Sequence, residues 1–197
     1  MKKISILFVC FIAAFGCESS FAQVAQQWSG SCRIQFNGKS TLHDFTGNVT
    51  AEPFLIAVSN PTDPVNAAAR GRVVAKAAKM DTQKPARDRK MYKVMGTGSF
   101  PDVVVDLGNL TAAATKPVAG GPVPTPTVIP FDLTIKGKTK KTIGKVSNWN
   151  YTDSKITFRV AFPVSLTSYG IKPPSVVGIV KVEDMISVTA DVSLSRK

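Results

Sequence analysis

The chain has 197 residues, of which 44% are hydrophobic, and its 25 Lys and Arg against 13 Asp and Glu give a net charge of +12. One domain of about 175 residues can bury roughly 70% of the surface of its unfolded chain, which is enough for one core. The basic balance is typical of proteins that meet anionic surfaces or nucleic acid, but it also fits a solvated surface that keeps a protein soluble. The N-terminal residues described next predict export, and an exported chain rarely meets nucleic acid, so we expect no such partner.

The first 22 residues predict a secretory signal peptide. Two lysines precede an almost uncharged run, residues 4–16, which is too short to span a bilayer as a helix. Ser20 and Ala22 occupy the −3 and −1 positions of a small-residue cleavage site. We therefore expect cleavage after Ala22, one domain over residues 23–197, and a periplasmic or secreted location.

The cysteines leave a second ending of the signal open. Gly16 before Cys17 would also fit a lipoprotein signal with Cys17 as its anchor. Ordinary cleavage leaves Cys32 as the only thiol, which cannot form an internal disulfide. Cys32 alternates in register with Ile34 and Phe36, and this favours a small buried side chain over a reactive thiol.

Period-two alternation predicts a mainly antiparallel β fold. Residues 156–166 show it most openly, because hydrophobic side chains take every second position from Ile156 to Leu166. We expect roughly eight strands, at residues 31–36, 45–58, 71–80, 103–111, 129–135, 142–151, 156–166 and 186–194. The fold class is therefore all-β, and a barrel of about eight strands satisfies it.

One stretch breaks this period. Met91, Val94 and Met95 follow Pro85 at helical spacing, so we expect one short helix over residues 85–95, lying across a barrel end. Residues 59–70 and 112–127 are rich in turn formers and predict loops.

No constellation of catalytic residues emerges. His43 and Asp44 are adjacent, and adjacent strand residues point to opposite faces, so they cannot easily act as base and orienting group. His43 is better explained as a turn histidine hydrogen-bonded near Ser40 and Thr41. A metal site would need further histidines or a cysteine cluster. We expect no enzyme activity, no cofactor and no metal.

A lysine cluster is the clearest surface feature, formed by Lys136, Lys138, Lys140, Lys141 and Lys145. It spans a strand end, a turn at Gly137 and the next strand. The lysines could hold the protein near anionic lipid headgroups, at about 1 kcal/mol each. They could equally prevent strand edges from aggregating.

Four segments, in this order, resemble the YceI family of exported polyisoprenoid-binding proteins. They are residues 31–47, with an opening strand, a turn and GKSTLHDFTG; residues 80–88, with Met-Asp-Thr followed by Arg-Asp; residues 133–140, LTIKGKTK; and the Ser168–Ile171 turn followed by the strand at residues 182–192. The family's usual Asn-Arg before the last turn is replaced here by Leu166 and Thr167. Each motif alone is weak, but the ordered set covers nearly all of the mature chain.

The resemblance implies a lipocalin-like barrel that carries or sequesters a long isoprenoid-type lipid in its lumen. Burial of an apolar tail contributes about 0.8 kcal/mol per CH₂, so no catalytic group is needed. By strand register, the candidate lumen residues are Phe36, Phe131, Leu133, Ile156, Phe158, Phe162, Val164 and Ile186. The alternative is a filled barrel that docks an acidic partner or an anionic membrane through the lysine cluster, because an eight-stranded barrel can be hollow or filled. Ligand identity, pathway and oligomeric state stay open.

Overall fold

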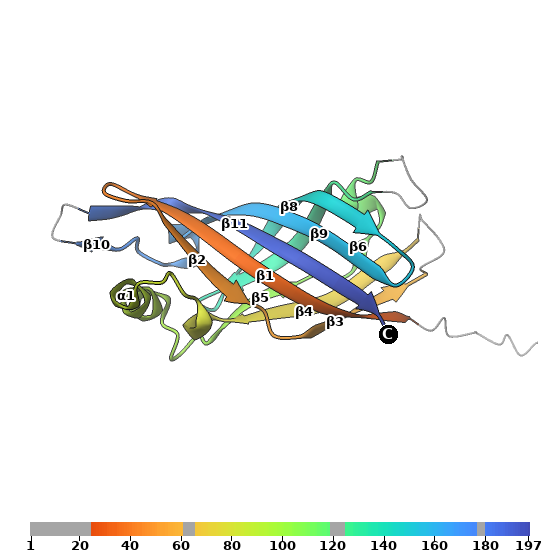
Figure 1. Ribbon diagram of the computed structural model, residues 1–197, viewed down its shortest axis with the longest axis horizontal. Coiled ribbons are helices and arrows are strands. Elements are labelled where there is room, and N and C mark those ends of the chain that lie inside the picture. The colour runs from red at the N-terminus through yellow and green to blue at the C-terminus, as the bar shows by residue number, and fades with distance from the viewer. Residues whose placement is uncertain (1–24, 61–65, 119–124, 177–179) are drawn as a thin grey trace, which may run out of the picture.

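The fold comes from a computed structural model, which describes residues 25–60, 66–118, 125–176 and 180–197. The expected signal peptide and the alternative anchor at Cys17 lie outside the described residues. The strands wrap into a barrel, with one α-helix at one end and the C-terminus at the other (Figure 1). The all-β prediction with one helix is confirmed.

Eleven strands and four helical segments make up the described part of the chain. The strands are β1 (Gln26–Ser40), β2 (Phe45–Thr50), β3 (Phe54–Ser59), β4 (Ala68–Lys76), β5 (Asp102–Asp106), β6 (Leu110–Thr111), β7 (Val128–Ile135), β8 (Lys138–Tyr151), β9 (Lys155–Ser165), β10 (Ser175–Val176) and β11 (Val180–Arg196). The helix is α1 (Pro85–Met95), and three 3₁₀ turns are η1 (Ala77–Lys79), η2 (Ala113–Thr115) and η3 (Thr167–Tyr169).

Eight of these strands close the barrel. Their order is β1, β11, β9, β8, β7, β5, β4 and β3, and β3 pairs again with β1. The pairing of β1 with β11 runs from Trp28 opposite Arg196 to Ser40 opposite Val182. All of these pairings are antiparallel. The expectation of an eight-stranded antiparallel barrel is therefore confirmed.

The single strand expected over residues 45–58 is wrong, because the chain breaks it into β2 and β3. Both pieces pair with the same edge of β1: β3 with Gln26–Gly30, and β2 with residues 33–38. Pro53 lies in the break and has no N–H to donate to a ladder. The amide of Glu52 donates instead to Val74 O at 2.8 Å, so the chain turns there toward β4.

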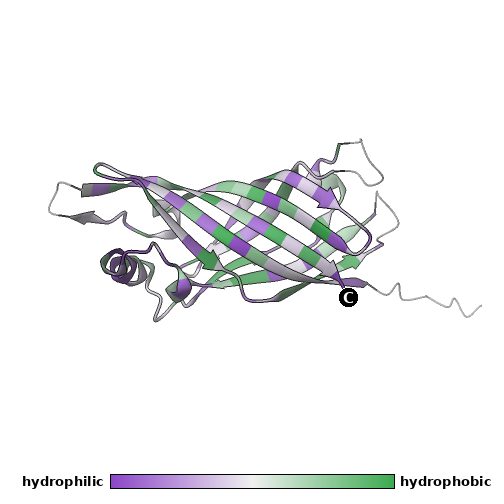
Figure 2. Cartoon of the chain, viewed as in Figure 1, coloured by the Kyte–Doolittle hydropathy of each residue, from purple (hydrophilic) through white to green (hydrophobic). Residues whose placement is uncertain are grey.

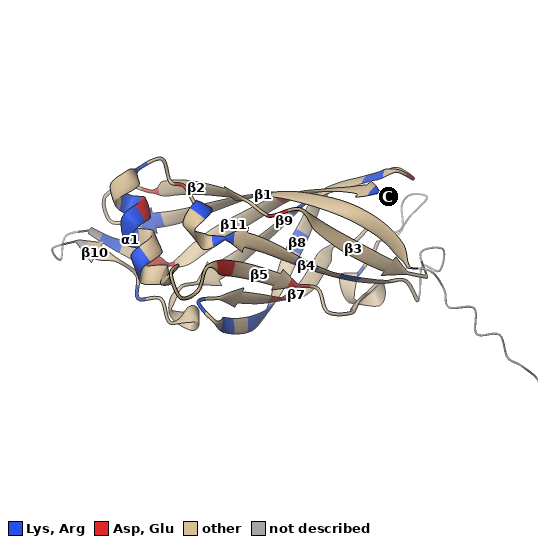
Figure 3. Ribbon diagram, turned by 90° about the horizontal axis from the view of Figure 1, so that it is seen from below, with Lys and Arg blue, Asp and Glu red and all other residues tan. Residues whose placement is uncertain are grey.

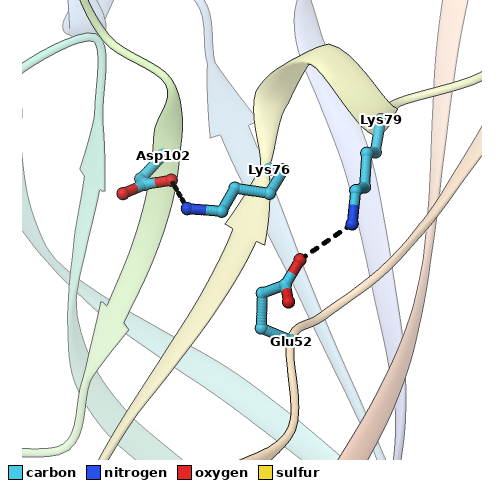
Figure 4. Close-up of polar contacts among 4 residues, drawn as sticks. All are labelled: Glu52, Lys76, Lys79 and Asp102. Atoms are coloured by element: carbon cyan, nitrogen blue, oxygen red, sulfur yellow. Dashed lines mark hydrogen bonds and ion pairs between the residues drawn. The ribbon is translucent and has the colours of Figure 1, made fainter.

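Two ion pairs surround this break (Figure 4). Lys79 Nζ lies 3.0 Å from Glu52 Oε1, and Lys76 Nζ lies 2.7 Å from Asp102 Oδ1. The first joins the segment between β2 and β3 to η1, and the second joins β4 to β5. All four side chains are substantially exposed, so solvent screens both pairs and neither contributes much to stability.

Two further expected strands have different bounds in the structure. The strand expected over residues 71–80 begins earlier, at Ala68, and gives way to η1 after Lys76. The strand expected over residues 103–111 is divided into β5 and β6 near Gly108, whose φ of +57° an extended strand cannot contain. The loops expected at residues 59–70 and 112–127 lie partly outside the described residues.

Helix α1 has the predicted bounds, and local chemistry explains both ends. Pro85 occupies the first helical position, where its missing N–H costs nothing. Gly96 ends the helix with φ +67° and ψ +45°, and its N–H donates to Tyr92 O and Lys93 O. This left-handed conformation is the common glycine cap of a helix C-terminus.

Hydrophobic and polar side chains alternate along the barrel strands (Figure 2). In β7 the inward residues are Ile129, Phe131, Leu133 and Ile135, all buried. In β1, β9 and β11 the even-numbered residues take the inward side, and aligned pairs such as Ile186 and Val164 lie on the same face. The register therefore defines one continuous interior.

Candidate functional site

The interior is hollow at the α1 end. A cavity of about 520 Å³ lies inside the wall formed by β1, β2, β4, β5, β7, β9 and β11, and α1 contributes to its lining. Most lining side chains are apolar, and they include Ile34, Val105, Ile135, Val164 and Val188. This volume is in the range of ligand pockets in proteins.

The sequence-predicted lumen residues divide into two groups. Five of them line this cavity: Phe36, Leu133, Phe162, Val164 and Ile186. The other three, Phe131, Ile156 and Phe158, belong to the same core, but the structure does not bring them to the cavity. Alternation along the strands predicted that all eight side chains face the interior. It does not indicate how far along the strands the cavity extends.

Large side chains fill the other half of the barrel, which we call the packed half. Its buried residues are Trp28, Cys32, Phe54, Ile56, Ile129, Phe131, Val160, Ala190 and Leu194. None of them lines the cavity. The phenyl ring of Phe54 lies so close to Gly30 that a Cβ there would overlap it. The barrel is thus hollow at one end and solid at the other.

Four hydrogen bonds hold helix α1 across the cavity. Buried Asp88 accepts hydrogen bonds from Thr82 N–H at 3.0 Å and from Thr82 Oγ1 at 2.6 Å. The hydroxyl of Tyr92 donates to Met80 O at 2.6 Å, and burial raises the pKa of Tyr92. Lys136, in the β7–β8 turn, donates through Nζ to Val94 O at 2.9 Å. These contacts turn Met91, Val94 and Met95 toward the cavity.

The lining residues between α1 and the β1–β2 turn keep contact with solvent: Leu42, His43 and Lys90 are exposed, and Ser40 and Arg87 are half-buried. We call this side of the cavity the mouth. Leu42 at the mouth is 57% exposed. Figure 3 shows the Lys and Arg positions on α1 at this end of the barrel.

The charged groups at the mouth are cationic. The Arg87 guanidinium lies over the Phe45 ring, 5.2 Å from its centroid, and Lys90 Nζ donates to Ser175 O at 2.8 Å. Among the described residues, no Asp or Glu lines the cavity, and neither cation forms an ion pair with a carboxylate. Sequence reasoning missed this feature, because the helix was predicted without knowledge of which side faces the opening.

The residues considered for chemistry offer no catalytic arrangement in the described part of the chain. The backbone of His43 forms the turn with Ser40: His43 N–H donates to Ser40 Oγ at 3.2 Å, and Ser40 Oγ donates to His43 O at 2.6 Å. Cys32 is buried as predicted, and burial raises its pKa to about 12, so the thiol stays protonated. No cluster of three or more metal-binding side chains occurs within the described ranges.

A closed eight-stranded barrel with an apolar cavity and one polar mouth defines a class, the small antiparallel barrels whose interior has room for one ligand. A family model, the YceI-like domain, matches residues 21–194 of this sequence. The chain therefore belongs to the YceI-like family. No functionally curated protein matches it. Among the described residues, no helix is long and apolar enough to span a bilayer.

Solved structures share the fold at low sequence identity. BcnA from Burkholderia cenocepacia matches with a TM-score of 0.59 and 16% identity, over 82% of this chain and 95% of that one. A polyisoprenoid-binding domain from Saccharophagus degradans, implicated in plant cell wall breakdown, matches with a TM-score of 0.56 and 11% identity, over 86% and 98%. The YceI protein of Campylobacter jejuni matches with a TM-score of 0.49 and 15% identity, over 81% and 84%.

Proposed function

We propose that this protein binds an apolar lipid of the isoprenoid type in the barrel cavity and carries or sequesters it, without chemical conversion. The lipid tail enters the cavity between α1 and the β1–β2 turn, and its polar head stays at the mouth. Membership of the YceI-like family, together with the fold shared with a domain described as polyisoprenoid-binding, supports this ligand class.

The observation that carries the proposal is the cavity itself. Around a cavity of about 520 Å³, the lining side chains lack the protein contacts that a solid core would give them. A buried tail restores these contacts and is removed from water at about 0.8 kcal/mol per CH₂. The cavity also disfavours the filled-barrel alternative, because filling is limited to the half of the barrel away from α1.

Native mass spectrometry of the purified protein, followed by lipid extraction, tests the proposal. Ile34→Trp places an indole in the cavity, because Ile34 lines it, whereas Gln35→Trp places the same group on the exposed outer face of β1. We expect bound lipid in the wild type and in Gln35→Trp, and little in Ile34→Trp. Absence of lipid from the wild type, with no uptake of added polyprenyl phosphate or quinone, would refute the proposal.

We also propose that the chain is exported and that the mouth end touches an anionic membrane when lipid is exchanged. Exposed Leu42 and the lysine-rich β7–β8 turn lie at the same end as α1. Cell fractionation tests the location. Sedimentation with vesicles containing phosphatidylglycerol, compared with phosphatidylcholine vesicles, tests the contact, which should weaken with salt. Equal binding to both vesicle types would contradict it.

A further inference from the structure

We infer that this cavity limits the length of the ligand's tail. The preferred ligand is a single-chain anionic amphiphile whose tail has about 12 to 17 carbons, or about three isoprene units. The anionic head would be held at Arg87 and Lys90, and the tail would end against Phe131. This inference rests on the proposed lipid-binding function and adds the ligand's length and charge.

The stop is built by Phe131 and the residues behind it. Phe162 lines the cavity, and Phe131 lies against it with ring centroids 5.1 Å apart and ring planes at 75°. Phe131 does not line the cavity and is only 7% exposed, so its ring belongs to the packed half. Trp28 and Phe54 are also buried in that half, and a tail cannot pass these rings without displacing them.

The volume of the cavity and its depth along β1 each limit the tail length. The cavity volume of about 520 Å³ holds roughly 17 carbon-sized groups, if each takes the ~30 Å³ that water occupies in the liquid. On β1 the lining runs from Ile34 to Ser40, which is about 20 Å of strand and about 15 Å along the axis of a barrel with ordinary strand tilt. With C–C bonds of about 1.5 Å, an extended chain advances about 1.3 Å per bond, so that depth fits about 12 carbons.

A limit on tail length also requires that the head group be held at one place. The cationic side chains Arg87 and Lys90 at the mouth would hold it there. Arg87 is positioned by the Phe45 ring and Lys90 by a backbone carbonyl, and neither contact neutralises the charge. An ammonium and a guanidinium that find no carboxylate partner in the described part of the chain favour a carboxylate or phosphate head. A head fixed at α1 leaves only the cavity depth for the tail.

Titration with unbranched fatty acids of about 10 to 24 carbons tests the stop, with binding expected to strengthen about fourfold per added methylene, the equivalent of about 0.8 kcal/mol, until the tail reaches Phe131. Beyond that length, each further carbon should add nothing or weaken binding. Farnesyl and geranylgeranyl phosphate test the same limit with isoprenoid tails.

Variants distinguish a stop from a general change in stability. Phe131→Ala removes a phenyl ring at the end of the cavity, so the longest accepted tail should become longer by up to about six carbons. Phe54→Ala deletes the same ring elsewhere in the packed half and should leave the limit unchanged. Should Phe131→Ala fail to fold, Val188→Phe provides the opposite test, because Val188 pairs with Phe162 and lines the cavity. It should shorten the accepted tail.

The mouth is tested with the fatty alcohol of the best fatty acid. The acid should bind at least tenfold more tightly than the alcohol, and Arg87→Gln with Lys90→Gln should remove that preference. Lys93→Gln, on the exposed side of α1, should not.

The outcomes separate the two levels of the argument. Binding that strengthens steadily up to the longest tail, or an unchanged limit in both Phe131→Ala and Val188→Phe, would overturn the length measurement and leave lipid binding intact. Equal binding of acid and alcohol would overturn the anionic head. No binding of any probe would refute the proposed function as well.

Discussion

Asp88 offers the sharpest test of how α1 is held over the cavity. Its buried carboxylate accepts two hydrogen bonds from Thr82, at 3.0 and 2.6 Å. Hydrogen bonds to a charged group contribute about 1.5–3 kcal/mol each, and a buried donor left without a partner costs a further part of its desolvation energy. Both bonds end on the same oxygen, Oδ1, so their energies do not add in full, and we expect Asp88→Ala to destabilise α1 by about 2–4 kcal/mol. Asp88→Asn keeps an acceptor oxygen and should cost about 1 kcal/mol.

Hydrogen exchange is the suitable assay, because α1 can open without unfolding of the barrel. In Asp88→Ala, the amides of residues 89–95 should exchange at least about thirtyfold faster, while those of β1 and β11 stay protected. Asp153→Ala, an exposed aspartate in the β8–β9 turn, is the control and should change little. Unchanged exchange of α1 in Asp88→Ala would show that the two hydrogen bonds do not hold the helix.

In urea denaturation, Leu133→Ala should lower the free energy of unfolding by about 2 kcal/mol and Leu194→Ala by about 3–4 kcal/mol, because Leu133 borders empty space and Leu194 is packed; equal losses would contradict this division. Hydrogen bonds from Ser165 Oγ and Thr167 N–H hold the pKa of Asp184 below its ordinary value of 3.8. A lowered pKa stabilises the fold above pH 3.8, and this contribution is lost as the pH falls through the folded-state pKa. Ser165→Ala should therefore move acid unfolding, followed by circular dichroism, to higher pH; an unmoved midpoint would refute this. Burial raises the pKa of Cys32 to about 12. In protein that lacks residues 1–22, Cys32 should therefore react with a disulfide reagent at about pH 8 only in denaturant. Rapid labelling of the native protein would argue against burial.

The sequence predicted those features that local chemistry determines. Alternation in β9 and β11 requires one apolar face, and Pro85 with Gly96 sets the ends of α1. The break at Pro53 was missed because residues on both sides of it suit a strand. Its cause is the partner: Glu52 N–H finds an acceptor on β4, and one sequence window contains no information on that distant strand.

The extent of the site could not be predicted for a related physical reason. Phe158 and Phe162 have the same register parity on β9, yet only Phe162 borders the cavity. Whether the interior is hollow or filled at a given height along the barrel axis depends on the size of the side chains that point inward from the opposite strands. The cationic mouth depends likewise on the docking of α1, which brings Arg87 and Lys90 beside the β1–β2 turn.

The closed ladder of eight strands and the aromatic residues far from α1 have a consequence for how such proteins diversify. Most of the close packing lies away from the cavity, so substitutions in the cavity lining should cost less stability than substitutions in the packed half. Positions such as Ala75 and Val103, which line the cavity, can then change in size without disturbing the packed half. The same separation makes this chain a suitable starting point for engineering new binding specificities.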